Sequence, residues 1–177
     1  KAPAVAIVVN SPGGAPVQSH LVYKRIRALA EENGQEVIIA VEDVAASGGY
    51  MIALAGDHIL VDPSSVVGSI GVVSAGFGFT GLIEKLGIER RVHTAGENKA
   101  MLDPFQPERD SDVAHLKSLQ RDVHDMFIAL VQSRRGGKLA DDPTLFSGAF
   151  WSGARGVELG LVDEVGELRA YLRGRFG

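Results

Sequence analysis

The sequence predicts an α/β domain built on a largely parallel sheet. Residues 4–9 form a continuous apolar run that ends in the turn-forming residues 10–14, which is typical of a strand buried on both faces. Apolar residues then recur at helical spacing between positions 17 and 30, and residues 36–41 form a second strand. A strand, a helix and a strand in this order favour a right-handed crossover between parallel strands.

The later elements continue this alternation. We predict, in order, a short helix at residues 50–55, a strand at 58–61, a strand with an embedded turn at 66–74, a short helix at 82–86, a strand at 89–94, a long helix at 112–135, and short helices at 154–159 and 168–172. The long helix is amphipathic, because Leu116, Phe127 and Val131 share one face and charged residues occupy the other.

Composition narrows the classes of function. The 177 residues carry a formal net charge of -4 without a dominant basic cluster, so we expect no nucleic-acid partner. The chain has no cysteine, which excludes disulfides, thiolate zinc sites and cysteine nucleophiles, and we expect no metal or other cofactor.

We interpret residues 1–177 as a single domain. No apolar run is long enough to span a membrane, and a strand-like run follows Lys1 almost at once, so we expect a fragment that lacks an upstream anchor and an N-terminal strand.

Ser47 is the candidate nucleophile. It stands between a predicted strand and a short helix and is followed by Gly48-Gly49, so its hydroxyl and the backbone N–H groups around it can face a cleft. The N–H groups of Gly48 and of Gly14, in the first glycine turn, are the candidate donors to an oxyanion. Spacing alone favours another interpretation, in which both glycine turns only let helices pack closely against the sheet.

The candidate base is Lys99. None of the five histidines has a persuasive position, and His115 and His124 lie on the long helix with the charged face, where a structural or solvated role fits them. Lys99 lies in a turn after a predicted strand, with apolar Met101 and Leu102 close behind it. A lysine accepts a proton only when burial or a nearby positive charge leaves it uncharged. Taken alone, the position of Lys99 favours a surface charge over a catalytic base.

Five motifs, taken together and in order, resemble the signal peptide peptidase or protease IV family of serine peptidases, peptidase family S49, and its SohB-like members most closely. They are Asn10-Ser11-Pro12-Gly13-Gly14, Ala45-Ala46-Ser47-Gly48-Gly49-Tyr50, Val67-Gly68-Ser69-Ile70-Gly71-Val72, Thr94-Ala95-Gly96 leading to Lys99, and Gly160-Leu161-Val162-Asp163-Glu164. The separation of 52 positions between Ser47 and Lys99 (99 minus 47) is also similar to this family.

The resemblance implies a crotonase-like or Clp-protease-like α/β fold and a set of roles. Ser47 would be the acylating nucleophile, Lys99 the general base, and Ser69 a helper that hydrogen-bonds the lysine amine, while Gly14 and Gly48 would form the oxyanion hole. Without the resemblance, Ser69 is better explained as a small residue in a tight turn. The implied function is a serine endopeptidase that hydrolyses extended apolar peptides, such as cleaved signal peptides, through an acyl-enzyme.

The resemblance also implies partners. We expect peptide substrates and a homo-oligomer in which the serine of one subunit can meet the lysine of its neighbour. We expect membrane association through an upstream anchor, at the bacterial inner membrane with the catalytic domain outside the cytoplasm. Two alternatives stay open on the same fold: a crotonase-like enzyme acting on acyl thioesters, and a non-catalytic assembly or binding subunit.

Overall fold

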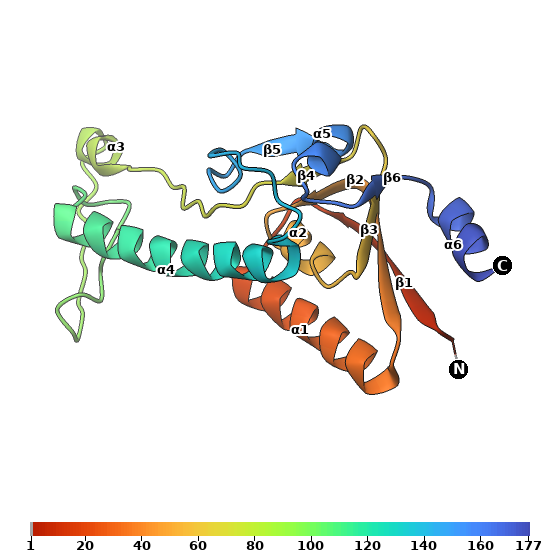
Figure 1. Ribbon diagram of the computed structural model, residues 1–177. Coiled ribbons are helices and arrows are strands. Elements are labelled where there is room, and N and C mark those ends of the chain that lie inside the picture. The colour runs from red at the N-terminus through yellow and green to blue at the C-terminus, as the bar shows by residue number, and fades with distance from the viewer. Residues whose placement is uncertain (1) are drawn as a thin grey trace. The chain divides into compact units, whose positions relative to one another are not determined.

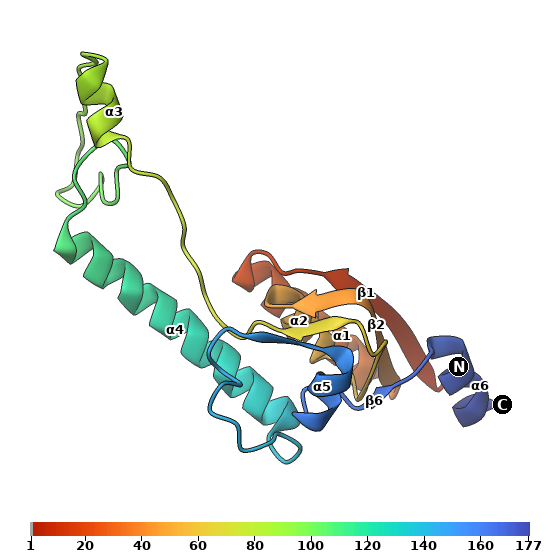
Figure 2. The same cartoon turned by 90° about the horizontal axis from the view of Figure 1, so that it is seen from above.

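The computed structural model describes residues 2–177, which form two compact units (Figure 1). Unit 1 contains the described residues up to Val72 and those from Val123 onward, and unit 2 is Val73–Asp122. The long helix α4 (Asp110–Arg135) contributes its first half to unit 2 and its second half to unit 1 (Figure 2).

Unit 1 is built on a six-stranded sheet. Its strands are β1 (Ala4–Ser11), β2 (Glu36–Ala46), β3 (His58–Val61), β4 (Val66–Gly68), β5 (Phe150–Ser152) and β6 (Glu164–Val165). All pairs are parallel except β4 with β5. β2 is central: β1 pairs along one edge, while β3 and β4 pair with successive parts of the other. This arrangement confirms the predicted mixed α/β fold and makes β1 an edge strand.

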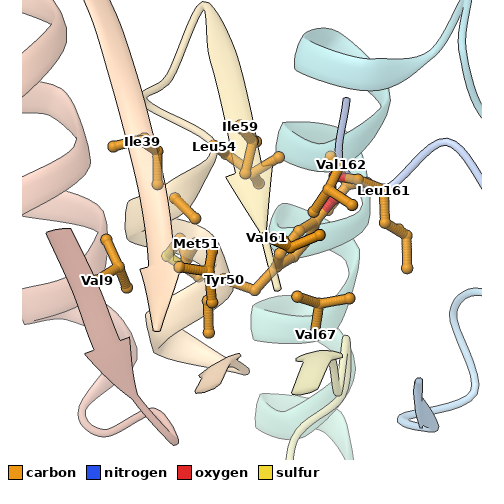
Figure 3. Packing of buried hydrophobic residues seen from close by; sticks show 14 of the residues in the cluster. Val9, Ile39, Tyr50, Met51, Leu54, Ile59, Val61, Val67, Leu161 and Val162 are labelled. Carbon is orange, nitrogen blue, oxygen red and sulfur yellow. The ribbon is translucent and has the colours of Figure 1, made fainter. Parts of the chain in front are cut away.

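Helices of unit 1 pack against this sheet and enclose the core. Besides α4, the helices are α1 (Pro16–Asn33), α2 (Gly48–Ala53), α3 (Thr80–Lys85, in unit 2), α5 (Gly153–Glu158) and α6 (Leu168–Phe176). Alternate residues of β2 and β3, including Ile39 and Val61, pack against Tyr50 and Leu54 in a fully buried cluster (Figure 3). Phe127, from the second half of α4, belongs to the same cluster. The core therefore includes the helix that directly follows Ser47.

Three sequence predictions about strands were wrong in part. β1 is not buried on both faces, because Val9 is its one buried residue and Val8 is 52% exposed. Residues 89–94 form no strand, and β4 stops at Gly68 rather than continuing to residue 74. Within the described chain, no neighbouring strand pairs with residues 69–74 or with residues 89–94. Among residues 2–177, no helix is both long and apolar enough to cross a bilayer.

Candidate active site

Ser47 occupies a strained turn between β2 and α2. Its backbone has φ 50° and ψ -122°, a conformation that costs a residue with a Cβ about 1–3 kcal/mol. The turn is held by two backbone hydrogen bonds: the Ser47 N–H donates to the Gly68 carbonyl at 2.8 Å, and the Ser47 carbonyl accepts from the Met51 N–H at 3.0 Å. The side chain is half-buried, and its hydroxyl forms no hydrogen bond within the described part of unit 1. Strain of this kind is typical of a serine presented for reaction.

The glycine turn after β1 lies against the Ser47 turn. A Cβ at Gly13, whose φ is 122°, would lie 2.9 Å from the Ser47 Cβ and 3.2 Å from the Gly48 nitrogen. A Cβ at Gly48 would lie 3.2 Å from the Gly14 nitrogen. The structure therefore brings Gly14, Gly48 and Ser47 together. It also supports close packing as a reason for the glycines, because a Cβ at Gly49 would overlap the carbonyl oxygen of Ser11.

Ser69 lies one residue beyond the carbonyl that Ser47 contacts. It follows β4 with φ 54°, and its N–H donates to the Ala149 carbonyl at 2.7 Å. Gly68 pairs with Ala46 at the end of β2, so the Ser69 turn and the Ser47 turn are neighbours through backbone contacts. Ser69 is half-buried. The structure thus places four of the five predicted site residues in unit 1.

Lys99, the fifth, belongs to unit 2. It lies in a series of turns, where its N–H donates to the Gly96 carbonyl at 3.2 Å, and its side chain is exposed. The apolar neighbours that we expected to cover it do not do so, since Leu102 is itself 38% exposed. Because Ser47 and Lys99 lie in different units, their pairing stays a prediction.

Sequence reasoning passed over one histidine. His124 lies in the second half of α4, half-buried, and its Nε2 is 3.0 Å from the Ile70 carbonyl oxygen, one residue beyond Ser69. The signal was its spacing: position 124 is three residues before Phe127 and seven before Val131, both buried, so all three share one helix face. The predicted face assignment had grouped it with the charged residues.

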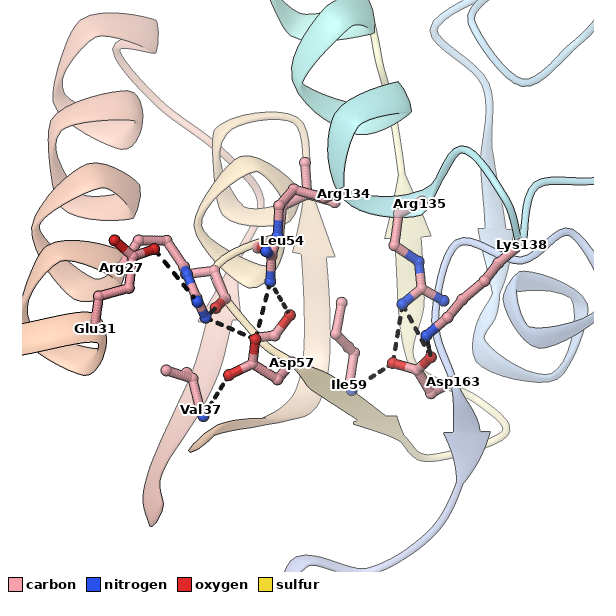
Figure 4. A network of polar contacts seen from close by, with 12 residues as sticks. Arg27, Glu31, Val37, Leu54, Asp57, Ile59, Arg134, Arg135, Lys138 and Asp163 are labelled. Atoms are coloured by element: carbon pink, nitrogen blue, oxygen red, sulfur yellow. Dashed lines mark hydrogen bonds and ion pairs between the residues drawn. The ribbon is translucent and has the colours of Figure 1, made fainter. Parts of the chain in front are cut away.

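A metal ion requires a set of ligating side chains that lie close together. No cluster of three or more histidine, aspartate or glutamate side chains with the geometry of a metal site occurs among residues 2–177. The ion pairs of unit 1 that surround Asp57 and Asp163 link helices to the sheet and belong to the scaffold (Figure 4).

Comparisons with known proteins identify relatives. The sequence pattern described as "Peptidase family S49" matches residues 30–173. The chain is 34% identical over 173 residues to "Serine protease SPPA, chloroplastic" of Arabidopsis thaliana, covering 93% of this chain and 24% of that protein. It is 31% identical over 162 residues to "Probable protease SohB" of Buchnera aphidicola subsp. Acyrthosiphon pisum, covering 92% of this chain and 47% of that protein.

A third relative has a different name. The chain is 62% identical over 176 residues to "Na(+)/H(+) antiporter NhaA" of Brucella abortus, covering 99% of this chain but 24% of that protein. The chain therefore spans between about a quarter and a half of the length of these three relatives.

Proposed function

The chain belongs to peptidase family S49, a family of serine proteases, and we propose that Ser47 and Lys99 are its catalytic dyad. The observation that supports this most strongly is the Ser47 turn. Ser47 is a non-glycine residue at positive φ, held by hydrogen bonds at its N–H and its carbonyl and packed against a second glycine turn. This conformation costs free energy, and strained residues of this kind cluster at active sites.

The proposed reaction proceeds through an acyl-enzyme. The Ser47 hydroxyl oxygen attacks the carbonyl carbon of a peptide bond while its proton passes to the uncharged Lys99 amine. The negative oxygen that forms accepts hydrogen bonds from the N–H groups of Gly14 and Gly48. The resulting ammonium returns a proton to the leaving amine as the carbon–nitrogen bond breaks, and water then hydrolyses the ester, with Lys99 again accepting the proton.

Ser69 would orient the lysine. In this proposal its hydroxyl accepts a hydrogen bond from the Lys99 amine and directs it toward Ser47. Support comes from its place one residue after the Gly68 carbonyl that Ser47 contacts. Ser69 is half-buried and has a positive φ, which is costly for a residue with a Cβ. Both features favour a functional role for its hydroxyl over a role as a small turn residue.

A second copy of the chain would complete the site. Lys99 is exposed, yet a basic lysine must lose water contact to be uncharged near neutral pH. Unit 2 contains no buried apolar side chain, although it presents many large ones to solvent: Val73, Phe77, Leu82, Leu86, Ile88, Val92, Leu102 and Leu119. A surface of this kind is typical of an interface, and we propose that assembly into a homo-oligomer covers it and desolvates Lys99.

The proposed substrates are extended apolar peptides. The open edge of β1 offers unpaired backbone groups close to the glycine turn, and extended peptides bind such edges by adding a strand. Remnants of signal sequences have this chemistry. We further propose that a segment upstream of this chain anchors the whole protein at the bacterial inner membrane, with the peptidase domain outside the cytoplasm. The antiporter name belongs to the Brucella protein as a whole, of which this chain matches 24%.

The dyad is tested by substitution in the full-length protein. We expect Ser47→Ala and Lys99→Ala each to lower the turnover of a fluorogenic apolar peptide by at least about a thousandfold, because each removes one of two groups that act as a unit. Lys117→Ala, at a lysine of α4, is the matched control and should retain parental turnover. In the parent, activity should rise with pH as the amine loses its proton.

The same variants separate the two alternatives. A fluorophosphonate that labels Ser47 in the parent but not in Lys99→Ala supports the dyad and excludes an acyl-thioester enzyme that does not use the serine. Turnover that is equal in the parent and in both variants would contradict the dyad. A parent that neither reacts with the phosphonate nor cleaves any peptide would favour a non-catalytic subunit.

A further inference from the structure

The turn that carries Ser69 is held at three successive residues by three different parts of unit 1. The Gly68 carbonyl accepts the Ser47 N–H at 2.8 Å, the Ser69 N–H donates to the Ala149 carbonyl at 2.7 Å, and the Ile70 carbonyl contacts His124 Nε2 at 3.0 Å. The first two contacts come from backbone. The third comes from a side chain, so it is the one that a single substitution can remove.

The chemistry of the third contact is defined by its acceptor. A carbonyl oxygen only accepts, so Nε2 carries the hydrogen and His124 donates to Ile70. Ile70 is fully buried, and a buried carbonyl without a partner costs about 1–3 kcal/mol. His124 therefore supplies a partner that solvent cannot readily replace.

The turn at residues 68–71 also packs closely against residues 148–151. A Cβ at Gly68 would lie 2.8 Å from the Trp151 ring, and a Cβ at Gly71 would lie 2.9 Å from the Gly148 Cα. The turn is thus confined against the segment that leads into β5. The contact of the same turn with α4 is the one between the Ile70 carbonyl and His124.

α4 holds the imidazole in place. Phe127 and Val131, on the same helix face as His124, are 2% and 0% exposed and belong to the core cluster. His115, on the same helix, is exposed and has no such position. The fold therefore anchors one of the two α4 histidines rigidly beside the Ser69 turn.

We propose that His124 is a positioning residue for the peptidase reaction, which fixes residues 68–70 and through them the Ser47 and Ser69 backbones. The inference rests on the proposed catalytic role of Ser47. His124 does not touch the reacting atoms in this scheme. It acts through one hydrogen bond to the Ile70 carbonyl, and that hydrogen bond sets the register of the Gly68 carbonyl against the Ser47 N–H.

Three substitutions at one position test the hydrogen bond in the full-length protein. His124→Ala removes the donor. His124→Gln places an amide nitrogen at about the reach of Nε2, whereas His124→Asn reaches only as far as Nδ1. His115→Ala is the matched control on the same helix. Each protein is measured for kcat, KM, thermal midpoint and amide hydrogen exchange of the segment that contains residues 66–72.

We expect kcat to fall about 3- to 10-fold in the alanine and asparagine variants, with KM within about twofold of the parent, and to recover in the glutamine variant. Exchange of the segment should speed up in the same two variants and return to the parental rate with glutamine. His115→Ala should match the parent in every measurement. A purely structural histidine would lower the thermal midpoint while each folded molecule kept parental kcat, and that result would overturn the proposal.

Hydrogen exchange keeps this inference distinct from the dyad. If Ser47→Ala has the same turnover as the parent, the proposed function fails. Hydrogen exchange tests the histidine separately: an exchange rate of residues 66–72 in His124→Ala equal to that of the parent would show that His124 does not hold the turn. If Ser47 is essential but all three His124 variants keep parental kcat, the dyad stands and the positioning role is refuted. Equal loss in all three variants, glutamine included, would also refute the hydrogen bond as its cause.

Discussion

Gly13 lies so close to Ser47 that a side chain at position 13 would collide with the serine. Its φ of 122° disfavours a side chain, and an added Cβ would lie 2.9 Å from the Ser47 Cβ and 3.2 Å from the Ala46 carbonyl oxygen. We expect Gly13→Ala to displace the Ser47 turn, to lower peptide turnover by at least about tenfold and to lower the free energy of unfolding by about 1–3 kcal/mol. Steady-state kinetics and urea denaturation would measure the two effects.

Gly174→Ala provides the matched control for this substitution. Gly174 lies in α6 at an ordinary helical φ, and an added Cβ there would have no atom within 4 Å. Alanine should leave turnover unchanged and raise stability by a few tenths of a kcal/mol. Parental turnover in Gly13→Ala would show that the glycine turn tolerates a side chain and is not part of the site.

For single residues, the sequence predicted that Ser47 lies close to Gly14 and Gly48 but not how the turns are held, and its pairing of Ser47 with Lys99 stays a prediction. The glycine pairs at positions 13–14 and 48–49 and the serine between them were recognisable, because paired glycines at a strand end usually mark a sharp turn or a close approach of backbones. The positive φ of Ser47 and Ser69 was not predictable, since serine rarely adopts it and nothing local requires it. His124 was missed because its partner is a backbone carbonyl 54 residues away.

The C-terminal end of α4 is tied to the sheet by one carboxylate. Asp163 accepts hydrogen bonds from Arg135 at 2.9 Å, from Lys138 at 2.6 Å and from the Ile59 N–H at 2.8 Å (Figure 4). Burial by itself raises the pKa of the Asp163 carboxyl, but the hydrogen bonds from Arg135 and Lys138 outweigh it and hold that pKa below its usual 3.8. The charged form is therefore the one that stabilises the fold.

The sign of the pH dependence follows from that lowered pKa. The stabilisation by Asp163 is fully present above the pKa of the unfolded chain, about 3.9, and is lost as the pH falls through the lower pKa of the folded state. We expect Asp163→Asn to lower the free energy of unfolding by about 2–3 kcal/mol at pH 7 and the difference from the parent to shrink below about pH 4. Urea denaturation at a series of pH values measures this. Asp125→Asn, at an exposed residue of α4, should follow the parental curve, and a constant difference for Asp163→Asn at all pH values would contradict the assignment.

Among the elements, those with a partner on each side were predicted best. β2 and β3 are apolar runs enclosed by neighbours, and α4 has both a long amphipathic pattern and Gly136 after its end. β1 was misjudged because an apolar run does not reveal whether other elements cover both faces of the strand. Residues 89–94 were misjudged for the same reason, since strand propensity without a pairing strand leaves the segment irregular.

The whole molecule joins a well-packed unit to one without a core. Among the described residues, all buried apolar side chains lie in unit 1, and the only buried residue of Val73–Asp122 is Asp112, which accepts hydrogen bonds from Arg109 and from the Leu102 N–H. A segment of this size without buried apolar surface gains little free energy from folding alone. The sequence could not predict this, because its apolar residues look the same whether they face the chain's own core or another subunit.

The proposed assembly of identical chains through unit 2 can be tested at a single aromatic residue. Phe77 is 81% exposed, and loss of an aromatic residue at an interface commonly costs more than about 1 kcal/mol, or about tenfold in the dissociation constant. We expect Phe77→Ser to shift sedimentation toward smaller species and to lower peptide turnover in a way that higher protein concentration restores. Phe176→Ser, at a 42% exposed phenylalanine ending α6, should sediment and react as the parent does. A parent that is monomeric at every concentration and fully active would refute assembly as the means of covering Lys99, as would a Phe77→Ser variant unchanged in both measurements.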